Sequence, residues 1–96
     1  MQQIIWSDEA VADFHQNINY LLENWPTSVA KEFIEDVEAV VELIKSHPDL
    51  YPLSDYKEIR RAVIRKQVTL FFKIEKDAIH LIRFWNNYQS PQKLKL

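Results

Sequence analysis

The chain contains no glycine in its 96 residues, although an average usage of about 7% would give about seven. A phosphate-binding P-loop and a dinucleotide-binding turn both need glycine, because the backbone must come close to the phosphates. The sequence therefore excludes both sites, and its turns are expected to use Asp, Asn, Ser and Pro. Cysteine is also absent, which excludes disulfides, thiol catalysis and cysteine-based zinc sites.

Long hydrophobic runs are lacking as well. No apolar stretch approaches the roughly 20 residues that a membrane span needs. The N-terminal sequence MQQIIWSDEA has neither the basic segment nor the long apolar core of a secretory signal. We therefore expect a cytoplasmic protein with one domain, residues 1–96, and a small core. His15, His47 and His80 show no spacing suited to a metal, so neither a metal nor a cofactor is expected.

Charge is distributed unevenly along the chain, although the net charge is only −2. Residues 1–58 carry 12 acidic side chains against 3 lysines, and residues 59–96 carry 9 basic side chains against 2 acidic ones. Two interpretations fit this pattern equally well. Either the second half binds something anionic, or the two halves attract each other in the fold.

Hydrophobic periodicity predicts the order of the secondary structure. Residues 3–6 indicate a short edge strand. Ser7 then caps a helix that Pro26 ends, and Thr27 or Ser28 caps a second helix that stops before Pro48. Residues 59–66, 67–74 and 78–85 are β-branched and aromatic with short connections, which favours an antiparallel meander. The sequence thus predicts an α+β fold in which a helical hairpin covers one face of a small antiparallel β-sheet (β-α-α-β-β-β).

The last predicted strand contains an arginine among apolar residues. Strict alternation places Arg83 on one face with Ile79, Leu81 and Trp85, and it places Phe84 on the other face with His80 and Ile82. An unpaired buried charge is costly. We therefore expect Arg83 to reach the rim of the sheet or to find a partner.

Basic and aromatic side chains are interleaved along these strands. The basic residues are Arg60, Arg61, Arg65, Lys66, Lys73, Lys76 and Arg83, and the aromatic ones are Phe71, Phe84, Trp85 and Tyr88. Such a mixture is typical of surfaces that bind single-stranded nucleic acid. In the alternative interpretation the aromatics belong to the core and the basic side chains are solvated, and the acidic pI of about 5.9 favours this alternative.

The order of elements and the ending IHLIRFWNNYQSP resemble the RelE/ParE superfamily of type II toxin–antitoxin toxins, and the resemblance runs from IIWSDEAVADF through the helical hairpin to SP. It implies a growth-inhibiting or plasmid-stabilising toxin with a cognate antitoxin as partner. The target is DNA gyrase in the ParE-like branch, or the ribosome and its mRNA in the RelE-like branch, whose members cut mRNA.

Carried over position by position, the resemblance gives candidate site residues. Arg83 matches the arginine of the last strand, and Arg60 matches roughly a basic position of the second strand. For a ribonuclease, the implied catalytic set is Arg83, Tyr88 and Arg60, since cutting RNA needs proton transfer and cations on the developing charge. The implied binding set is Arg61, Arg65, Trp85, Asn86 and Gln89.

Several positions depart from the ribonuclease pattern. Asn86 stands where many members have histidine, Tyr88 and Gln89 stand where the family often has basic residues, and Thr69 stands about where the RNA-cutting branch has an arginine. The alternation of the last strand also argues against His80 as a substitute, because it places His80 opposite Arg83. The sequence therefore favours the ParE-like branch, with an RNA-cutting enzyme and an inactivated antitoxin-binding relative as the alternatives.

Overall fold

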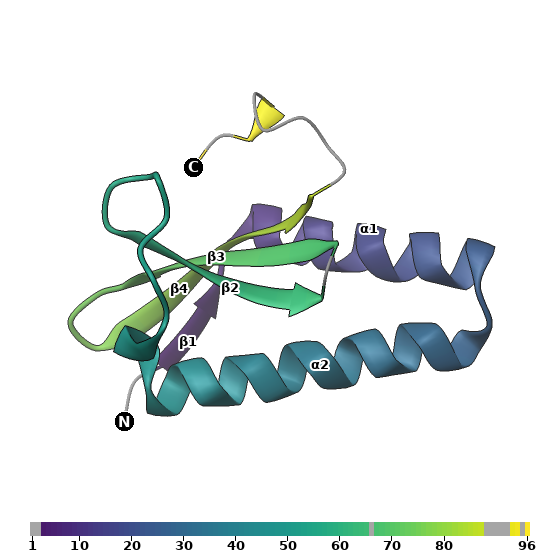
Figure 1. Ribbon diagram of the computed structural model, residues 1–96, viewed down its shortest axis with the longest axis horizontal. Coiled ribbons are helices and arrows are strands. Elements are labelled where there is room, and N and C mark those ends of the chain that lie inside the picture. The colour runs from purple at the N-terminus through teal and green to yellow at the C-terminus, as the bar shows by residue number, and fades with distance from the viewer. Residues whose placement is uncertain (1–2, 66, 88–92, 95) are drawn as a thin grey trace.

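The computed structural model describes residues 3–65, 67–87, 93, 94 and 96, and it shows two helices packed on a four-stranded sheet (Figure 1). The predicted element order is confirmed. The elements are β1 (Gln3–Trp6), α1 (Asp8–Asn24), α2 (Thr27–Ser46), the short 3₁₀ helix η1 (Pro48–Leu50), β2 (Ile59–Arg65), β3 (Val68–Ile74) and β4 (Ala78–Asn86).

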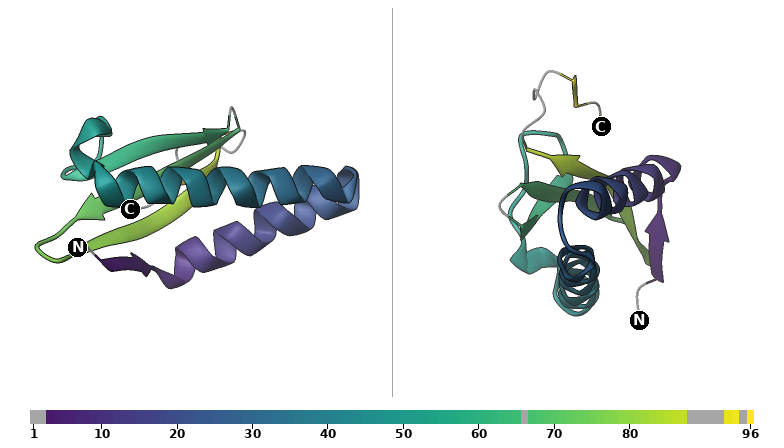
Figure 2. Two further views of the ribbon diagram at one scale, coloured as in Figure 1. Left: turned by 90° about the horizontal axis from the view of Figure 1, so that it is seen from below. Right: turned by 90° about the vertical axis from the view of Figure 1, so that its right-hand side faces the viewer.

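The sheet has the strand order β1-β4-β3-β2, so the N-terminal strand lies at an edge as expected. The last three strands form the predicted antiparallel meander, while β1 runs parallel to β4 and makes the sheet mixed. The direction of β1 relative to β4 cannot be predicted from the sequence, because no tight turn connects these two strands. The helical hairpin covers one face of this sheet, and neither α1 nor α2 lies on the other face (Figure 2).

Local capping follows the sequence at α1 and differs at α2. The Ser7 hydroxyl oxygen accepts a hydrogen bond from the Ala10 backbone N–H at 3.0 Å, which confirms Ser7 as the N-cap. The cap of α2 is Pro26, without a side-chain hydrogen bond, so the expectation of Thr27 or Ser28 as cap was wrong. Both residues lie inside the first helical turn.

The main core lies between the hairpin and the sheet. Apolar side chains from α1 and α2 meet the inner face of the sheet, where Leu70, Phe72, Ile79 and Leu81 are fully buried. Phe33 of α2 is equally inaccessible to solvent. This packing is what the 3.6-residue and two-residue periods predicted.

A β-bulge in β4 changes which residues share a face. Phe71 pairs with Arg83 and Phe72 pairs with Leu81, so Ile82 is the extra residue. The expected alternation was therefore wrong beyond Leu81, because the insertion moves Phe84 into the main core. The cross-strand pairs place a different set on the outer face, by which we mean the face away from the helices: Ile59, Arg61, Val63, Thr69, Phe71, Lys73, His80, Arg83 and Trp85.

The absence of glycine has a visible consequence just before β2. Glu58 adopts a φ of 62°, in the left-handed region that glycine occupies most easily. A residue with a Cβ loses about 1–2 kcal/mol in this conformation. The loop that leads into β2 thus contains a residue with a strained backbone conformation.

Candidate functional site

The outer face carries a second, smaller apolar cluster. Ile59, Phe71, Trp85 and Leu94 are buried against one another. Beside them lies a pocket of about 360 Å³, lined by Leu53, Ser54, Asp55, Tyr56, Arg61, Thr69, Phe71, Trp85, Asn87 and Leu94. Aromatic side chains, the cation Arg61, the carboxylate of Asp55 and several hydroxyl and amide groups therefore surround one hollow on the outer face.

Arg61 is the cation of this pocket. Its side chain is exposed, and among the residues that the structure describes it has no ion-pair or side-chain hydrogen-bond partner. Thr69, across the hollow, donates its hydroxyl proton to the Asn87 side-chain oxygen at 3.1 Å. Arg61 is thus available to an external anionic group.

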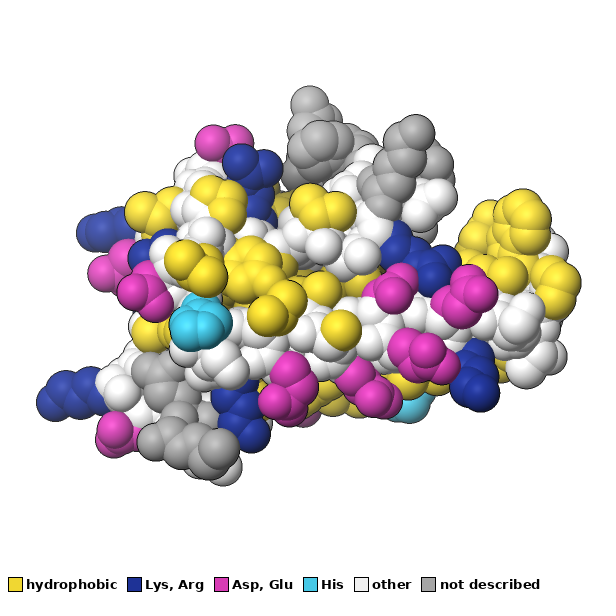
Figure 3. Space-filling model, turned by 60° about the horizontal axis from the view of Figure 1, so that its bottom comes forward, with side chains coloured by type: hydrophobic (Ala, Val, Ile, Leu, Met, Phe, Trp, Pro, Cys, Tyr) yellow, Lys and Arg dark blue, Asp and Glu magenta, His cyan; other side chains and the backbone are white. Residues whose placement is uncertain are grey.

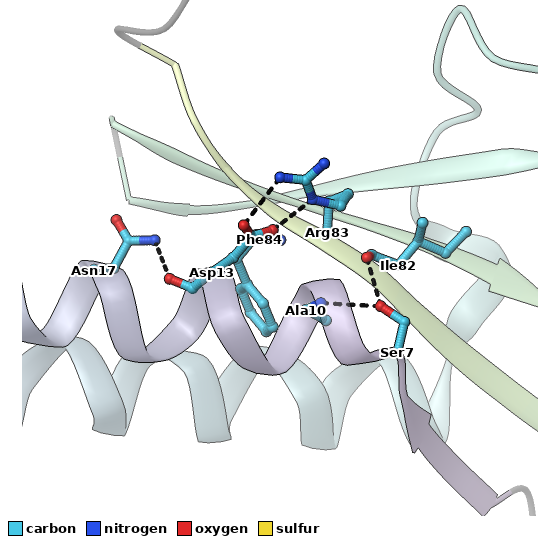
Figure 4. A network of polar contacts seen from close by, with 7 residues as sticks. All are labelled: Ser7, Ala10, Asp13, Asn17, Ile82, Arg83 and Phe84. Atoms are coloured by element: carbon cyan, nitrogen blue, oxygen red, sulfur yellow. Dashed lines mark hydrogen bonds and ion pairs between the residues drawn. The ribbon is translucent and has the colours of Figure 1, made fainter. Parts of the chain in front are cut away.

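Arg83 is held by Asp13 of α1 instead (Figure 4). Its Nε and one terminal nitrogen donate to the two carboxylate oxygens at 2.7 and 3.0 Å, and the side chains are only 20% and 11% exposed. The hydrogen bond and charge of Asp13 raise the pKa of Arg83, against an opposing effect of burial. The guanidinium carbon also lies 5.2 Å from the centre of the Trp85 ring, within the range of a cation–π contact. The expectation that Arg83 needs a partner is therefore confirmed.

Asp13 also serves the backbone of β4. Its carboxylate accepts a hydrogen bond from the Phe84 N–H at 3.1 Å, while the Ser7 hydroxyl donates to the Ile82 carbonyl at 2.7 Å. Both contacts lie past Leu81, where the pairing of β4 with β1 ends. Side chains at the start of α1 thus form hydrogen bonds with the backbone groups of β4 that lie beyond its pairing with β1.

Two other predicted residues point away from the outer face. A terminal nitrogen of Arg60 donates to the Tyr51 carbonyl at 2.6 Å, and Arg65 Nε donates to Asp36 of α2 at 2.6 Å. Arg65 also lies 3.6 Å from Glu32. The acidic and basic halves of the chain therefore attract each other within the fold at Arg65 and Arg83, whereas Arg61 keeps an open positive charge.

The remaining predicted residues divide between the two faces. Trp85 lies on the outer face, and Asn86 lines a groove on the helical side. His80 shares the outer face with Arg83, so the argument from alternation against it was wrong. Tyr88 and Gln89 lie outside the described residues.

Asp13 was the main contact that sequence reasoning missed. It sits between Ala10 and Phe14 in the buried stripe of α1. A carboxylate in such a stripe needs a cation, and this was the signal that pairs it with Arg83. Across the part of the chain that the structure describes, no cluster of three or more metal-ligating side chains occurs, and neither helix is long and apolar enough to span a membrane.

Comparison with solved structures identifies the fold class. The toxin–antitoxin structure "Chromosomal ParDE TA system from P. aeruginosa" superposes with a TM-score of 0.78 at 15% identity, covering 90% of this chain and 96% of that one. A YoeB/ParE toxin from Agrobacterium tumefaciens gives 0.66 at 10% identity over 88% and 98%, and the E. coli DinJ–YafQ complex gives 0.60 at 13% over 92% and 96%. The fold is that of RelE/ParE-like toxins.

The sequence narrows this class to one family. Residues 4–90 match the family described as "ParE toxin of type II toxin-antitoxin system, parDE". The chain therefore belongs to the ParE toxin family, within the RelE/ParE superfamily of type II toxins. No curated protein sequence matches it.

Proposed function

We propose that this chain is a ParE-like toxin that arrests growth by binding a target such as DNA gyrase in the cytoplasm, and that a cognate antitoxin neutralises it. Membership of the ParE family supports this assignment. So does the outer face, which offers Arg61 and an aromatic pocket as a binding surface. We expect Arg61 and the pocket beside Trp85 to contact the target, with Gln89 as a further contact. Arg65 and Asn86 face the helical side, so they reach the target only where it extends around the end of the sheet.

The contacts of two arginines within the fold favour target binding over RNA cleavage as the function. Arg83 uses one edge of its guanidinium, Nε and one terminal nitrogen, on Asp13, and one terminal nitrogen of Arg60 donates to the Tyr51 carbonyl on the other side of the sheet. A ribonuclease needs its cations on the developing phosphorane charge. Either arginine has to serve a phosphate with its remaining N–H groups or give up a contact within the fold.

An RNA-cutting enzyme is the second candidate, with Arg83, Tyr88 and Arg60 as its catalytic residues. The observation that favours it is the outer face itself, where His80, Arg61 and Trp85 lie on one side of the sheet. Aromatic rings and a free cation are suited to stacked bases and phosphate. In that case His80 is a further candidate for proton transfer.

Two assays on the same purified protein separate the candidates. We expect inhibition of gyrase supercoiling, relieved by the antitoxin, and intact mRNA on translating ribosomes. Cleavage of mRNA within codons, with supercoiling unchanged, would establish the ribonuclease instead. Binding of the antitoxin without any growth arrest would identify an inactivated relative that serves only as a binding module.

A further inference from the structure

The apolar cluster on the outer face includes one residue from the C-terminal end of the chain. The members of this outer cluster are Ile59, Phe71, Trp85 and Leu94. Leu94 is only 8% exposed, whereas its neighbours Lys93 and Leu96 are exposed. Figure 2 shows this end of the chain on the side of the sheet away from α2. Among the residues of the C-terminal tail (88–96) that the structure describes, Leu94 is thus the one that anchors the tail to the outer face.

The hydrophobic effect, rather than charge, holds this tail in place. In the sequence Lys93 and Lys95 flank Leu94, whereas exposed acidic side chains gather along α2 on the other side of the sheet (Figure 3). A basic tail guided by charge would lie along α2 instead. None of the described tail residues forms a hydrogen bond or an ion pair with the rest of the described chain. In this part of the chain, the burial of Leu94 is therefore what keeps the tail on the outer face.

An anchor of this kind is weak and reversible. The hydrophobic gain from burying one leucine is about as large as the entropy cost of fixing one or two residues of backbone. A segment held in this way exchanges between a bound and a released state. Phe71 and Trp85 are only 8% and 6% exposed while Leu94 lies against them. Their aromatic surface therefore becomes available to a partner when the tail is released.

The position of Leu94 also matters for the charge of the pocket. Leu94 lines the pocket together with Arg61 and Asp55, which form no ion pair with each other. Arg61 is exposed and has no partner among the described residues. Since the neighbours of Leu94 in the sequence are lysines, the tail supplies an apolar side chain but no anion for Arg61. A segment with an aliphatic side chain beside an acidic one would satisfy both.

We propose that the C-terminal tail competes with the target for the outer face, and that an aliphatic side chain of the target replaces Leu94 in the outer cluster. An acidic side chain of the same target segment then pairs with Arg61. The inference rests on the proposed function in one respect, because it takes the outer face as the target-binding surface. Only the fraction of chains with a released tail is ready to bind, which lowers the apparent affinity for the target.

Supercoiling assays with DNA gyrase provide the first test. Leu94→Ala weakens the anchor, so it is expected to inhibit supercoiling at a concentration about threefold or more below that of the wild type. Leu96→Ala is the matched control, because Leu96 belongs to the same tail but not to the outer cluster or the pocket lining. It is expected to inhibit like the wild type, and thermal unfolding checks that both variants fold. Equal or weaker inhibition by a folded Leu94→Ala variant would overturn the inference, since Leu94 would then only complete the cluster.

The second test measures release of the tail directly. Because the chain lacks cysteine, Leu94→Cys introduces a single thiol, and its rate of alkylation is read as a mass adduct on this chain. We expect slow alkylation in the free chain and alkylation about threefold or more faster with saturating gyrase. Leu96→Cys is the control and is expected to react fast in both conditions. A rate for the Leu94→Cys variant that gyrase lowers or leaves unchanged would contradict displacement of the tail.

A synthetic peptide copy of residues 88–96 separates this inference from the proposed target. At about millimolar concentration the peptide matches the effective concentration of a segment on a short tether, so it is expected to speed alkylation of the Leu94→Cys variant. The same peptide with Leu94→Asp is the control and is expected to have no effect. If the wild-type chain does not inhibit gyrase but the peptide speeds alkylation, the proposed target fails while competition for the outer cluster is supported. If the peptide leaves the rate unchanged, the tail is a fixed part of the fold and the inference fails.

Discussion

The two faces of the sheet use similar residues in different ways. On the inner face, Phe72 is fully buried under the helices, and Arg65 is paired with α2. On the outer face, Phe71 belongs to a small cluster beside an open pocket, and Arg61 has no partner among the described residues. The inner face therefore stabilises the fold, while the outer face keeps an exposed arginine beside a pocket lined by aromatic side chains.

Phe71 and Phe72, adjacent in β3, provide the sharpest comparison of the two faces. Phe72→Ala is expected to lower the free energy of unfolding by about 4 kcal/mol, because it opens a cavity in the main core. Phe71→Ala is expected to cost about 2 kcal/mol, since solvent and neighbouring groups fill the space beside the pocket. Urea denaturation measures both. Equal losses would show that the outer cluster contributes as much to stability as the core does.

The ion pairs Asp13–Arg83 and Asp36–Arg65 both join a helix to the sheet, and they differ in burial. Asp13→Ala leaves a largely buried Arg83 and the Phe84 N–H without their acceptor, so we expect a loss of about 3 kcal/mol. Asp36→Ala is the control, because its pair with Arg65 is 43% exposed at the carboxylate and is expected to contribute about 1 kcal/mol or less. Denaturation in low and high salt measures both. A comparable loss in the two variants would contradict a structural role specific to Asp13.

Substitution of Ser7 tests how much the contacts at the edge of β4 contribute to stability, and its expected effect is smaller. Ser7→Ala removes the N-cap of α1 and the bond to the Ile82 carbonyl, so we expect a loss of about 1 kcal/mol. Ser28→Ala, inside the first turn of α2, is the matched control and is expected to change stability by less than about 0.5 kcal/mol. Thermal unfolding of the two variants checks this difference, and an unchanged stability of the Ser7 variant would contradict the assigned cap.

Helices, strands and their order were predictable because each follows from a local period in the sequence. The long apolar stripes of α1 and α2 and the short connections of β2, β3 and β4 leave few alternative arrangements. The parallel pairing of β1 was not predictable, because four residues carry no signal for direction. The bulge at Ile82 was also missed, since one inserted residue leaves the apolar pattern of β4 almost unchanged.

The candidate site was predictable in part. The sequence showed that Arg83 needs a partner, but a partner 70 residues away depends on how α1 lies across the end of β4. The division of Arg60, Arg61 and Arg65 between the faces depended on register, which a run of basic residues does not reveal. Which arginines remain available is thus a property of the fold.

Substitution of Arg61 tests most directly whether the outer face binds the target. Arg61→Glu is expected to change stability by less than about 0.5 kcal/mol, since its side chain is exposed. The same variant is expected to weaken inhibition of gyrase supercoiling about tenfold or more through like-charge repulsion at the contact. The control is Lys76→Glu in the exposed turn between β3 and β4, which carries the same charge change and is expected to inhibit like the wild type. Equal inhibition by both variants would contradict the assignment of the outer face as the target-binding surface.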